Sequence, residues 1–421
     1  MTTLYTTTGE AIPAYRTDGS LVWGMPEPPE PDLTVRRHIT ADVWKTGRAN
    51  QARVPNAPVT YMTAHRVHAH GQSITLTYGG HLPDGVTMDC AAAVEVEGRG
   101  SRVVATWGGS PSATLTGTTQ QTTDPLALTV GPGDVLRVFT YHSQRSDGLN
   151  HPASSSTWYS NEILDGNQVA AGQPITEGSG YQGAGGYRAV MPHAITAMTS
   201  EEQISVALLG DSQMESGSPG NAPLPVGRQH AARTWAQRLD TEVPVANYAH
   251  WGTGYPGALR EGVFAPIPDL SLFTHAICAW GSNNFPNASA SLATAKERAA
   301  QVWGWIAAEC PNVYQTTPLP QSDSVDGWAT VEGQTPRANH TLRVQFNEWL
   351  RDGAELPTGE RIGDVGHPLA GIIDISDYAS TSRDSGVFRV DSGPMAVDGA
   401  HMSDVGHGLV SQAARDWLAA L

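Results

Sequence analysis

The most constraining feature of the sequence is an apolar run that stops at Gly-Asp-Ser. Residues 204–209 read Ile-Ser-Val-Ala-Leu-Leu, and Gly210-Asp211-Ser212 follows directly. A short apolar run that ends at a turn residue is typical of a buried strand. Ser212 is therefore expected on a tight turn at a strand end, where a nucleophile is accessible. Because a free serine hydroxyl is a poor nucleophile, it needs a base and oxyanion donors from elsewhere in the chain.

Strand-like and helix-like segments alternate after residue 196. The apolar runs that predict strands are 204–209, 243–248, 272–280 and 370–375. The segments with apolar residues at three- and four-residue steps, which predict helices, are 229–239, 295–310, 341–351 and 405–421. This alternation predicts an α/β three-layer domain over residues 196–421, with a parallel sheet covered on both faces. Loops at the carboxyl ends of its strands should converge on the reactive site.

The first half of the chain has a different pattern of apolar and turn residues. Residues 36–195 contain short alternating apolar runs separated by turn residues such as Gly79-Gly80 and Gly131-Pro-Gly-Asp134. This pattern predicts an all-β accessory or binding domain, a sandwich of jelly-roll-like type. Residues 1–35 end in a proline cluster, which predicts an extended arm or linker that could attach the chain to a larger assembly.

Composition excludes several classes of protein. The net charge is −16, from 25 basic and 41 acidic residues, and no run of Lys or Arg occurs, so a nucleic-acid partner is not expected. Cys90, Cys278 and Cys310 are scattered, which predicts neither a disulfide framework nor a metal site. No apolar run is long enough for a membrane span, and the N-terminus lacks the pattern of a Sec-type signal. An extracellular or virion-associated placement is favoured over a cytoplasmic one.

Partners for Ser212 follow the later strands. Gly252 lies in the loop after the second predicted strand, where its backbone N–H can approach a substrate closely. Asn283 follows the third strand, and its carboxamide can donate a hydrogen bond to an oxyanion without bringing a charge. Asp398 precedes His401 by three residues, so one short turn can present the histidine as a base and the aspartate as its orienting group.

These segments together resemble the four blocks of the SGNH, or GDSL-type, hydrolase family. The blocks correspond to Gly210-Asp-Ser212, Gly252, Gly281-Ser-Asn283 and Asp398-Gly-Ala-His401, in the family's order, and the resemblance covers about residues 200–421. It implies a flavodoxin-like fold in which Ser212 attacks an acyl carbonyl, His401 is the general base and Asp398 orients it. It further assigns the oxyanion hole to the Ser212 and Gly252 N–H groups and the Asn283 side chain. No metal or organic cofactor is implied.

Competing residues exist for each role. Ser392 also follows a short apolar run, but Pro394 comes next and no amphipathic helix follows, which favours Ser212. Asn284 is expected to be structural beside Asn283. The competitors of His401 are His250, His367 and His407. His65, His68 and His70 could form a metal site, but a partly exposed strand is favoured there. Sugar-stacking roles are an alternative for four aromatic residues, Trp107, Trp158, Tyr159 and Trp251.

The sequence thus predicts a serine esterase that works through an acyl-enzyme. The leading substrate hypothesis is an O-acetylated carbohydrate or cell-surface polysaccharide. A first alternative is a bacteriophage-tail or surface attachment protein that uses the fold mainly to bind a glycan. A second is a short-chain lipid esterase or thioesterase. The Gly- and Pro-rich loop at 217–227 is expected to shape substrate access.

Overall fold

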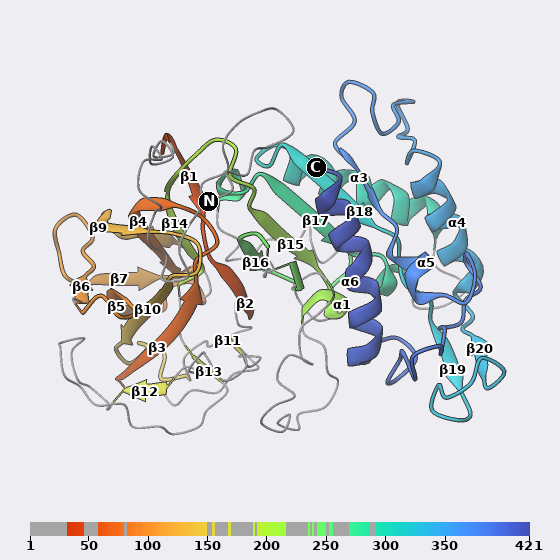
Figure 1. Cartoon of the computed structure of the whole chain (residues 1–421), viewed down its shortest axis with the longest axis horizontal. Coiled ribbons are helices and arrows are strands. Elements are labelled where there is room, and N and C mark those ends of the chain that lie inside the picture. The colour runs from red at the N-terminus through yellow and green to blue at the C-terminus, as the bar shows by residue number, and fades with distance from the viewer. Residues whose placement is uncertain are drawn as a thin grey trace, which may run out of the picture.

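Two regions lie side by side in the computed structural model, antiparallel sheets in one and a parallel sheet with helices in the other (Figure 1). The described residues are 32–45, 58–79, 82–100, 102–149, 154–155, 167–169, 188–189, 192–215, 235, 238–239, 242–249, 252–255, 269–285 and 291–421. Most of the predicted arm, the loop at 217–227 and most of the helix predicted at 229–239 therefore lie outside the described residues.

The parallel sheet positions the candidate site. Its strand order is β2-β16-β15-β17-β18-β21, and every neighbouring pair is parallel. The strands are β2 (Ala41–Lys45), β15 (Val206–Gly210), β16 (Val245–Asn247), β17 (His275–Ala279), β18 (Asn312–Thr316) and β21 (Gly371–Ile373). The four strands predicted after residue 196 all form, each shorter than its apolar run, and all four lie in this sheet.

Two strands of this sheet differ from the sequence analysis. Strand β2 lies within the range assigned to the β-rich half, yet it pairs with β16 at the edge of the parallel sheet. Strand β18 was not predicted, because Asn312 and Gln315 interrupt its apolar pattern. Residues 41–45 therefore supply an edge strand of the parallel sheet, and the division of the chain into domains at residue 195 stays a prediction.

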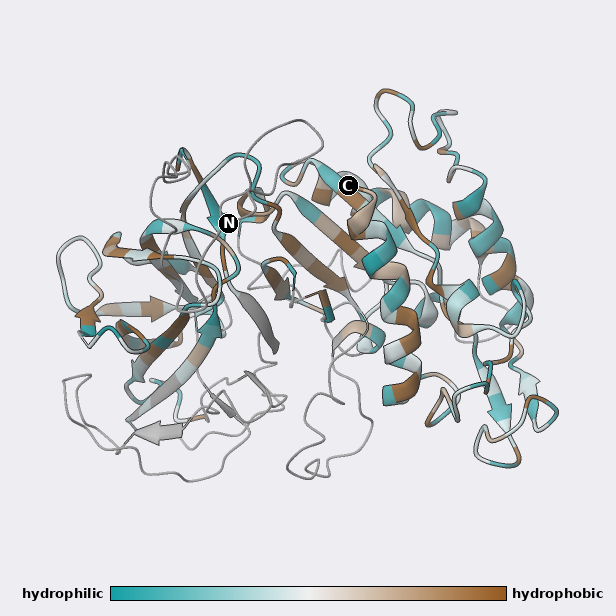
Figure 2. Cartoon of the chain, in the orientation of Figure 1, coloured by the Kyte–Doolittle hydropathy of each residue, from teal (hydrophilic) through white to brown (hydrophobic). Residues whose placement is uncertain are grey.

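Helices cover both faces of the sheet. Successive residues of β15 point to opposite faces: Val206 and Leu208 belong to a core shared with α6, whereas Ala207 and Leu209 belong to a core shared with α3 and α4. The hydrophobic segments of β15 and β17 and the apolar side of α6 are visible in Figure 2. The three layers predicted for residues 196–421 are present. The helices are α1 (Ser212–Glu215), α3 (Leu292–Ala307), α4 (His340–Arg351), α5 (Ile375–Ala379) and α6 (Asp404–Ala419), with 3-10 turns η3 (Leu270–Leu272) and η4 (Ser282–Asn284).

Serine side chains start the two longest helices. Ser291 accepts a hydrogen bond from the Thr294 N–H at the start of α3, and Ser403 accepts one from the Gly406 N–H at the start of α6. Each cap satisfies a backbone donor that has no partner inside the helix. The start of α6 matters for the site, because it follows Asp398 and His401 directly. None of the described helices is both long and apolar enough to cross a membrane.

The first half of the chain contains two antiparallel sheets. One has the order β1-β14-β4-β8 with β9 on β4, and the other has the order β12-β3-β10-β5-β6 with β7 on β5. Buried residues from both sheets, including Leu76 of β4 and Val138 of β10, share one hydrophobic core. The assignment of this half to a jelly-roll-like sandwich stays a prediction.

The strands of these two sheets have the following bounds: β1 (Val35–His38), β3 (Val59–Arg66), β4 (Gly71–Gly79), β5 (Thr87–Val96), β6 (Arg102–Val104), β7 (Ala113–Thr116), β8 (Gln120–Thr122), β9 (Leu126–Val130), β10 (Val135–His142), β12 (Asn167–Val169) and β14 (Ala194–Thr199). Two small pairs complete the described strands, β11 (Ser154–Ser155) with β13 (Arg188–Ala189) and β19 (Ser322–Ser324) with β20 (Gln334–Pro336).

A largely buried ion cluster ties α4 to α5. Arg351 binds both carboxylate oxygens of Asp374, at 2.6 and 3.0 Å, and also contacts Asp377 and Asp384. Burial by itself raises the pKa of Asp374, but the hydrogen bonds and charge of Arg351 outweigh it, so the pKa lies below its usual range. A depressed carboxyl pKa stabilises the fold above the unfolded-state pKa of about 3.9, and this contribution is lost as pH falls through the folded-state pKa.

Replacement of Arg351 tests this cluster. Arg351→Met should lower the free energy of unfolding by about 3 kcal/mol at pH 7, because it leaves the partly buried Asp374 carboxylate without its cation. The stability of the variant should also fall less than that of the parent protein between pH 5 and pH 3. Urea denaturation at both pH values measures this. Arg383→Met is the matched control, because Arg383 contacts Asp377 with a side chain that is 67% exposed, and its replacement should lower the free energy of unfolding much less. Equal costs for the two variants would contradict the assignment.

Candidate active site

Ser212 lies where β15 ends and α1 begins. Asp211, which is fully buried, caps the helix: its Oδ1 accepts a hydrogen bond from the Gln213 N–H at 3.0 Å. The Met214 N–H donates to the Asp211 carbonyl at 3.0 Å, which completes the turn. The turn is also packed tightly, because a Cβ at Gly210 would lie 3.2 Å from Ala279 of the neighbouring strand. The predicted strand, turn and helix context of Ser212 is therefore present, with one turn of α1 in the described residues.

A chain of two hydrogen bonds joins the three residues predicted to act together. The Ser212 hydroxyl lies 2.7 Å from His401 Nε2, and His401 Nδ1 lies 2.7 Å from Asp398 Oδ2. Since Nδ1–H donates to the carboxylate, Nε2 is left as the acceptor for the serine proton. The side chains of His401 and Asp398 are 26% and 41% exposed, so solvent and a substrate can reach them. The order of contacts is that of a nucleophile, a base and an orienting carboxylate.

The carboxylate of Asp398 is held in its charged form. Partial burial raises its pKa, but hydrogen bonds from the His401 N–H, the His401 ring and the Ala400 N–H outweigh burial and lower the pKa. The two backbone bonds go to Oδ1, at 2.8 and 3.0 Å, which leaves Oδ2 for the imidazole. The carboxylate is thus fixed in place and can favour a positive charge on His401 during reaction.

Asn283 and the loop of Gly252 lie beside the nucleophile turn. Asn283 Nδ2 donates to the Thr253 carbonyl at 2.8 Å and to Asp211 Oδ2 at 3.3 Å. The Thr253 hydroxyl donates to the Gly210 carbonyl at 3.4 Å and accepts a bond from Trp280 Nε1 at 3.1 Å. Gly252 has a φ of +72°, and a Cβ placed on it would have no atom of the described residues within 4 Å. The structure therefore gathers Gly252 and Asn283 around the same turn as Ser212, while their role as oxyanion donors stays a prediction.

Glycine is required at the end of β17. Gly281 has a φ of +143°, and a Cβ there would lie 2.5 Å from Pro318, so any side chain would displace the loop that carries Asn283. Asn284 has the structural contact expected of it, because its Oδ1 accepts the Tyr255 N–H at 3.2 Å. The Tyr255 hydroxyl in turn donates to the Trp280 carbonyl at 3.0 Å. These contacts connect the loops after β16 and β17.

The competing residues take other positions. Ser392 is exposed in a turn next to a β-bridge between Asp391 and Gly393. His407 is buried in α6, where its Nδ1 accepts the Trp235 N–H at 3.2 Å. Burial, followed by the charges of Arg238 and His401, lowers the pKa of His407 to about 3, so this ring is neutral at physiological pH. His367 bonds to the Ala354 carbonyl, and His250 lies outside the described residues.

The remaining sequence candidates are accounted for in the same way. Cys90, Cys278 and Cys310 are free and buried. His65 is buried and lies 2.7 Å from the Thr63 hydroxyl, whereas His70 is exposed. Within the described ranges, no group of three His, Cys, Asp or Glu side chains is arranged to hold a metal. Of the sugar-stacking candidates, Trp107 is partly buried beside Tyr78, and Trp158, Tyr159 and Trp251 lie outside the described residues.

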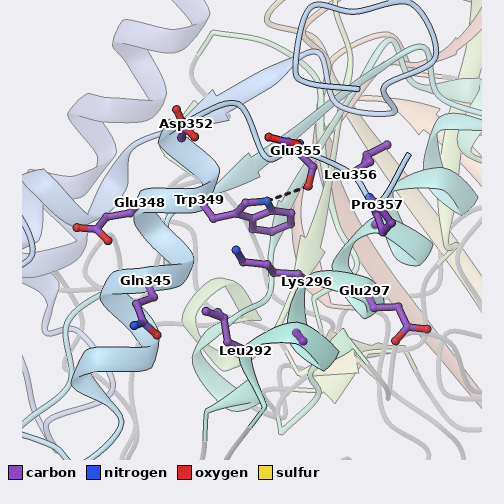
Figure 3. A pocket seen from close by; sticks show the side chains of 12 residues that line it. Leu292, Lys296, Glu297, Gln345, Glu348, Trp349, Asp352, Glu355, Leu356 and Pro357 are labelled. Atoms are coloured by element: carbon purple, nitrogen blue, oxygen red, sulfur yellow. Dashed lines mark hydrogen bonds between the residues drawn. The ribbon is translucent and has the colours of Figure 1, made fainter. Parts of the chain in front are cut away.

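A groove between α3 and α4 is separate from these residues (Figure 3). Its cavity volume is about 850 Å³, and Trp349 forms part of its lining with Lys296 Nζ 5.0 Å from the ring centroid. The Trp349 Nε1–H donates to the Glu355 carbonyl at 3.0 Å, and the ring stacks on the buried Trp303. None of the groove's lining residues belongs to the Ser212 site. Both apolar and charged side chains of the two helices line this groove.

Several side chains that contact this machinery were not predicted to do so. Gln213 and Thr253 donate to backbone carbonyls of the site, Trp280 donates to the Thr253 hydroxyl, and Arg337 donates to the Asp398 carbonyl. Their sequence signal is weak, because Gln, Thr and Arg occur in many surroundings. Thr253 could have been found from its place between Gly252 and Gly254. Arg337 could not, since it comes from the distant hairpin of β19 and β20.

Solved structures that resemble the chain are GDSL-type lipolytic proteins and carbohydrate esterases. A family two carbohydrate esterase from Clostridium thermocellum, in complex with cellohexaose, covers 92% of this chain and 100% of its own, at 11% identity and a TM-score of 0.37. A carbohydrate esterase family 2 enzyme with a carbohydrate binding domain from Corynascus thermopiles (Myceliophthora fergusii) covers 92% and 99%, at 12% identity and a TM-score of 0.35. The lipase/acylhydrolase from Enterococcus faecalis covers 51% and 95%, at 20% identity and a TM-score of 0.33.

Comparison by sequence gives no relatives. No protein-family model matches the chain. No curated protein sequence matches it either.

The close packing of the Asp398–His401 turn gives a testable consequence. Gly399 has a φ of +75°, and a Cβ there would overlap the Ser322 carbonyl oxygen. Gly399→Ala should therefore lower the free energy of unfolding by about 2–3 kcal/mol, measured by urea denaturation. Gly408→Ala is the control, because Gly408 lies in α6 and its nearest neighbour would be 3.6 Å from the new Cβ. The control should be neutral or stabilising by up to about 1 kcal/mol, and a neutral Gly399→Ala would refute the close packing.

Proposed function

We propose that the protein is a serine esterase that forms an acyl-enzyme at Ser212. The observation that carries the proposal is the hydrogen-bonded chain from Ser212 through His401 to Asp398, with 2.7 Å at each step. These distances lie within the reach required of a nucleophile and its base. Ester hydrolysis is the reaction that this arrangement serves without a cofactor.

The reaction proceeds in two halves. Ser212 Oγ attacks the ester carbonyl carbon as His401 Nε2 takes the hydroxyl proton, and the carbonyl π electrons move onto oxygen. The tetrahedral intermediate collapses and expels the alkoxide, which takes the proton from His401 and leaves as the alcohol. A water molecule then attacks the acyl group with His401 again as base, releases the carboxylic acid and restores Ser212. Asp398 stabilises the imidazolium in both halves through Nδ1–H.

The proposed oxyanion hole uses three donors. They are the backbone N–H groups of Ser212 and Gly252 and the Asn283 side chain. Asn283 has two hydrogen bonds from Nδ2, and the longer one, 3.3 Å to Asp211, is the bond that a developing oxyanion would replace. Asn283 Nδ2 would then donate to the substrate oxygen, which becomes negatively charged in the transition state. Stabilisation of the transition state raises the rate.

Loss of each role should have a distinct kinetic effect on a small acetyl ester. Ser212→Ala should lower kcat by about 10⁶-fold, because only binding and the oxyanion donors remain, and Asp398→Asn should lower kcat by about 10⁴-fold because it removes the orienting charge. Asn283→Ala should lower kcat by about 10²–10³-fold. The steady-state kinetics of purified variants measure these effects. Full activity in Ser212→Ala would overturn the proposed function.

We further propose an acetylated carbohydrate as the substrate class. Several described side chains around Ser212 are polar, among them Gln213, Thr253 and Asn283. Polar surroundings suit a short acyl group on a hydroxyl-rich alcohol, whereas a fatty acyl chain would require an apolar channel.

Chain-length preference separates the candidate substrates. Among p-nitrophenyl esters, kcat/KM should be highest for acetate and should fall by about 10-fold or more at octanoate, because a longer chain gains no apolar contact. Acetate release from O-acetylated glycans, followed by proton NMR, should require Ser212. An optimum at long acyl chains would favour the lipid esterase alternative. Activity on short esters with no release from any acetylated glycan would retain the esterase and refute the carbohydrate substrate.

A further inference from the structure

The turn that carries Asp398 and His401 is held by contacts from three other segments. Arg337 Nη2 donates to the Asp398 carbonyl at 2.9 Å, and the Ser322 N–H donates to the Gly399 carbonyl at 3.0 Å. The Gln213 side-chain amide donates to the Ala400 carbonyl. Three successive carbonyls therefore each accept a hydrogen bond from a residue more than sixty positions away in the chain.

Two of these donors come from one side of the turn. Ser322 lies in β19, and Arg337 follows β20 directly. The hairpin is itself well supported, because Trp328 Nε1–H donates to the Ser322 hydroxyl at 3.1 Å and Arg337 Nε binds Asp323 at 2.9 Å. The hairpin thus forms a fixed support behind the turn.

Gln213 is the donor on the side of the nucleophile. It follows Ser212 in the chain, and its own N–H is bound by Asp211 Oδ1 at 3.0 Å. Its backbone is therefore fixed to the nucleophile turn and its side chain to the Ala400 carbonyl, one residue before His401. Among the described residues, Gln213 bonds both to the turn at Ser212 and to the turn that carries His401. Ser212 and His401 themselves are joined by the hydrogen bond between Oγ and Nε2.

The surroundings of the amide support a role beyond stability. Gln213 is 5% exposed, and its Oε1 has no hydrogen-bond partner among the described residues. A buried carbonyl oxygen without a partner costs stability, and such groups in a protein call for an explanation. A methionine would fill the same space without that cost. The hydrogen bond from Gln213 Nε2 to the Ala400 carbonyl, one residue before His401, gives a reason for glutamine at position 213.

We propose that Gln213 is a positioning residue, whose amide holds the Ala400 carbonyl so that the His401 imidazole stays in line with Ser212 Oγ. This inference rests on the proposed esterase function, because it deepens the account of the same site. Displacement of a catalytic group by about 1 Å can cost about 10²-fold in rate. A single hydrogen bond next to His401 can therefore have a large effect on kcat without touching the substrate.

The test compares Gln213→Met with the parent protein and with Gln345→Met, which changes an exposed glutamine of α4. Gln213→Met should lower kcat on a short acetyl ester by about 10–100-fold, with KM changed by less than about threefold. Its melting temperature should stay within about 5 °C of that of the parent protein, because removal of the unpaired Oε1 offsets loss of the Nε2 bond to the Ala400 carbonyl. Gln345→Met should change neither quantity. An unchanged kcat in Gln213→Met would overturn the proposal.

A double-mutant cycle separates positioning from other effects. A residue that acts through His401 has nothing left to position once the imidazole is gone, so Gln213→Met should change kcat by less than about twofold in a His401→Ala background. If the two losses multiply instead, Gln213 acts independently of the base and the proposal is wrong.

A measurement without turnover keeps the inference distinct from the proposed function. The hydrogen bond from His401 Nδ1 to Asp398 should give a low-field proton NMR signal in the parent protein and in Gln345→Met. The signal should broaden or vanish in Gln213→Met at a temperature where circular dichroism shows an intact fold. If the parent protein hydrolyses no ester, the proposed function fails and this comparison alone decides the inference. An unchanged signal in Gln213→Met would then refute the positioning role.

Discussion

The hydrogen bond between Ser212 and His401 joins residues 189 positions apart, and the arrangement of the second half of the chain can be understood from it. Ser212 is placed by the end of β15, at the middle of the parallel sheet. His401 is placed by the turn before α6, which packs on one face of that sheet. The bond can form only because the strand end and the start of the helix meet at the same edge. Packing of α6 and β15 in one hydrophobic core therefore decides the distance between these two side chains.

The surroundings of that bond are polar and closely paired. The Asp398 carboxylate uses one oxygen for two backbone N–H groups and the other for the imidazole. Asp211, fully buried, pairs with the Gln213 N–H and with Asn283. Buried polar groups of this kind cost free energy unless they are satisfied, and once satisfied they fix geometry. The hydrogen bonds of Asp398 and Asp211 thus fix the positions of the side chains around Ser212, although they contribute little to the net stability of the fold.

The sequence was a good guide where the signal is local. The run before Gly210 predicted β15, the periodic segments predicted α3, α4 and α6, and the three-residue spacing of Asp398 and His401 allowed a turn that presents both. It was a poor guide where pairing is non-local. The parallel partner of β16 is β2, which comes from the first 45 residues, and strand propensity carries no information on which strands pair. Strand β18 was missed because its polar residues hide the apolar pattern.

The sequence by itself determined which chemical groups this protein brings to a reaction: a serine after a buried strand, an aspartate and a histidine on one turn, and an asparagine and a glycine at strand ends. Local backbone preferences and the periodicity of apolar residues suffice for that, since both act over a few residues. Only the tertiary structure decided that Gln213, Ser322 and Arg337 bond to three successive carbonyls of the same turn. Those contacts depend on where a hairpin and a helix settle on the sheet, and that placement results from packing over the whole core.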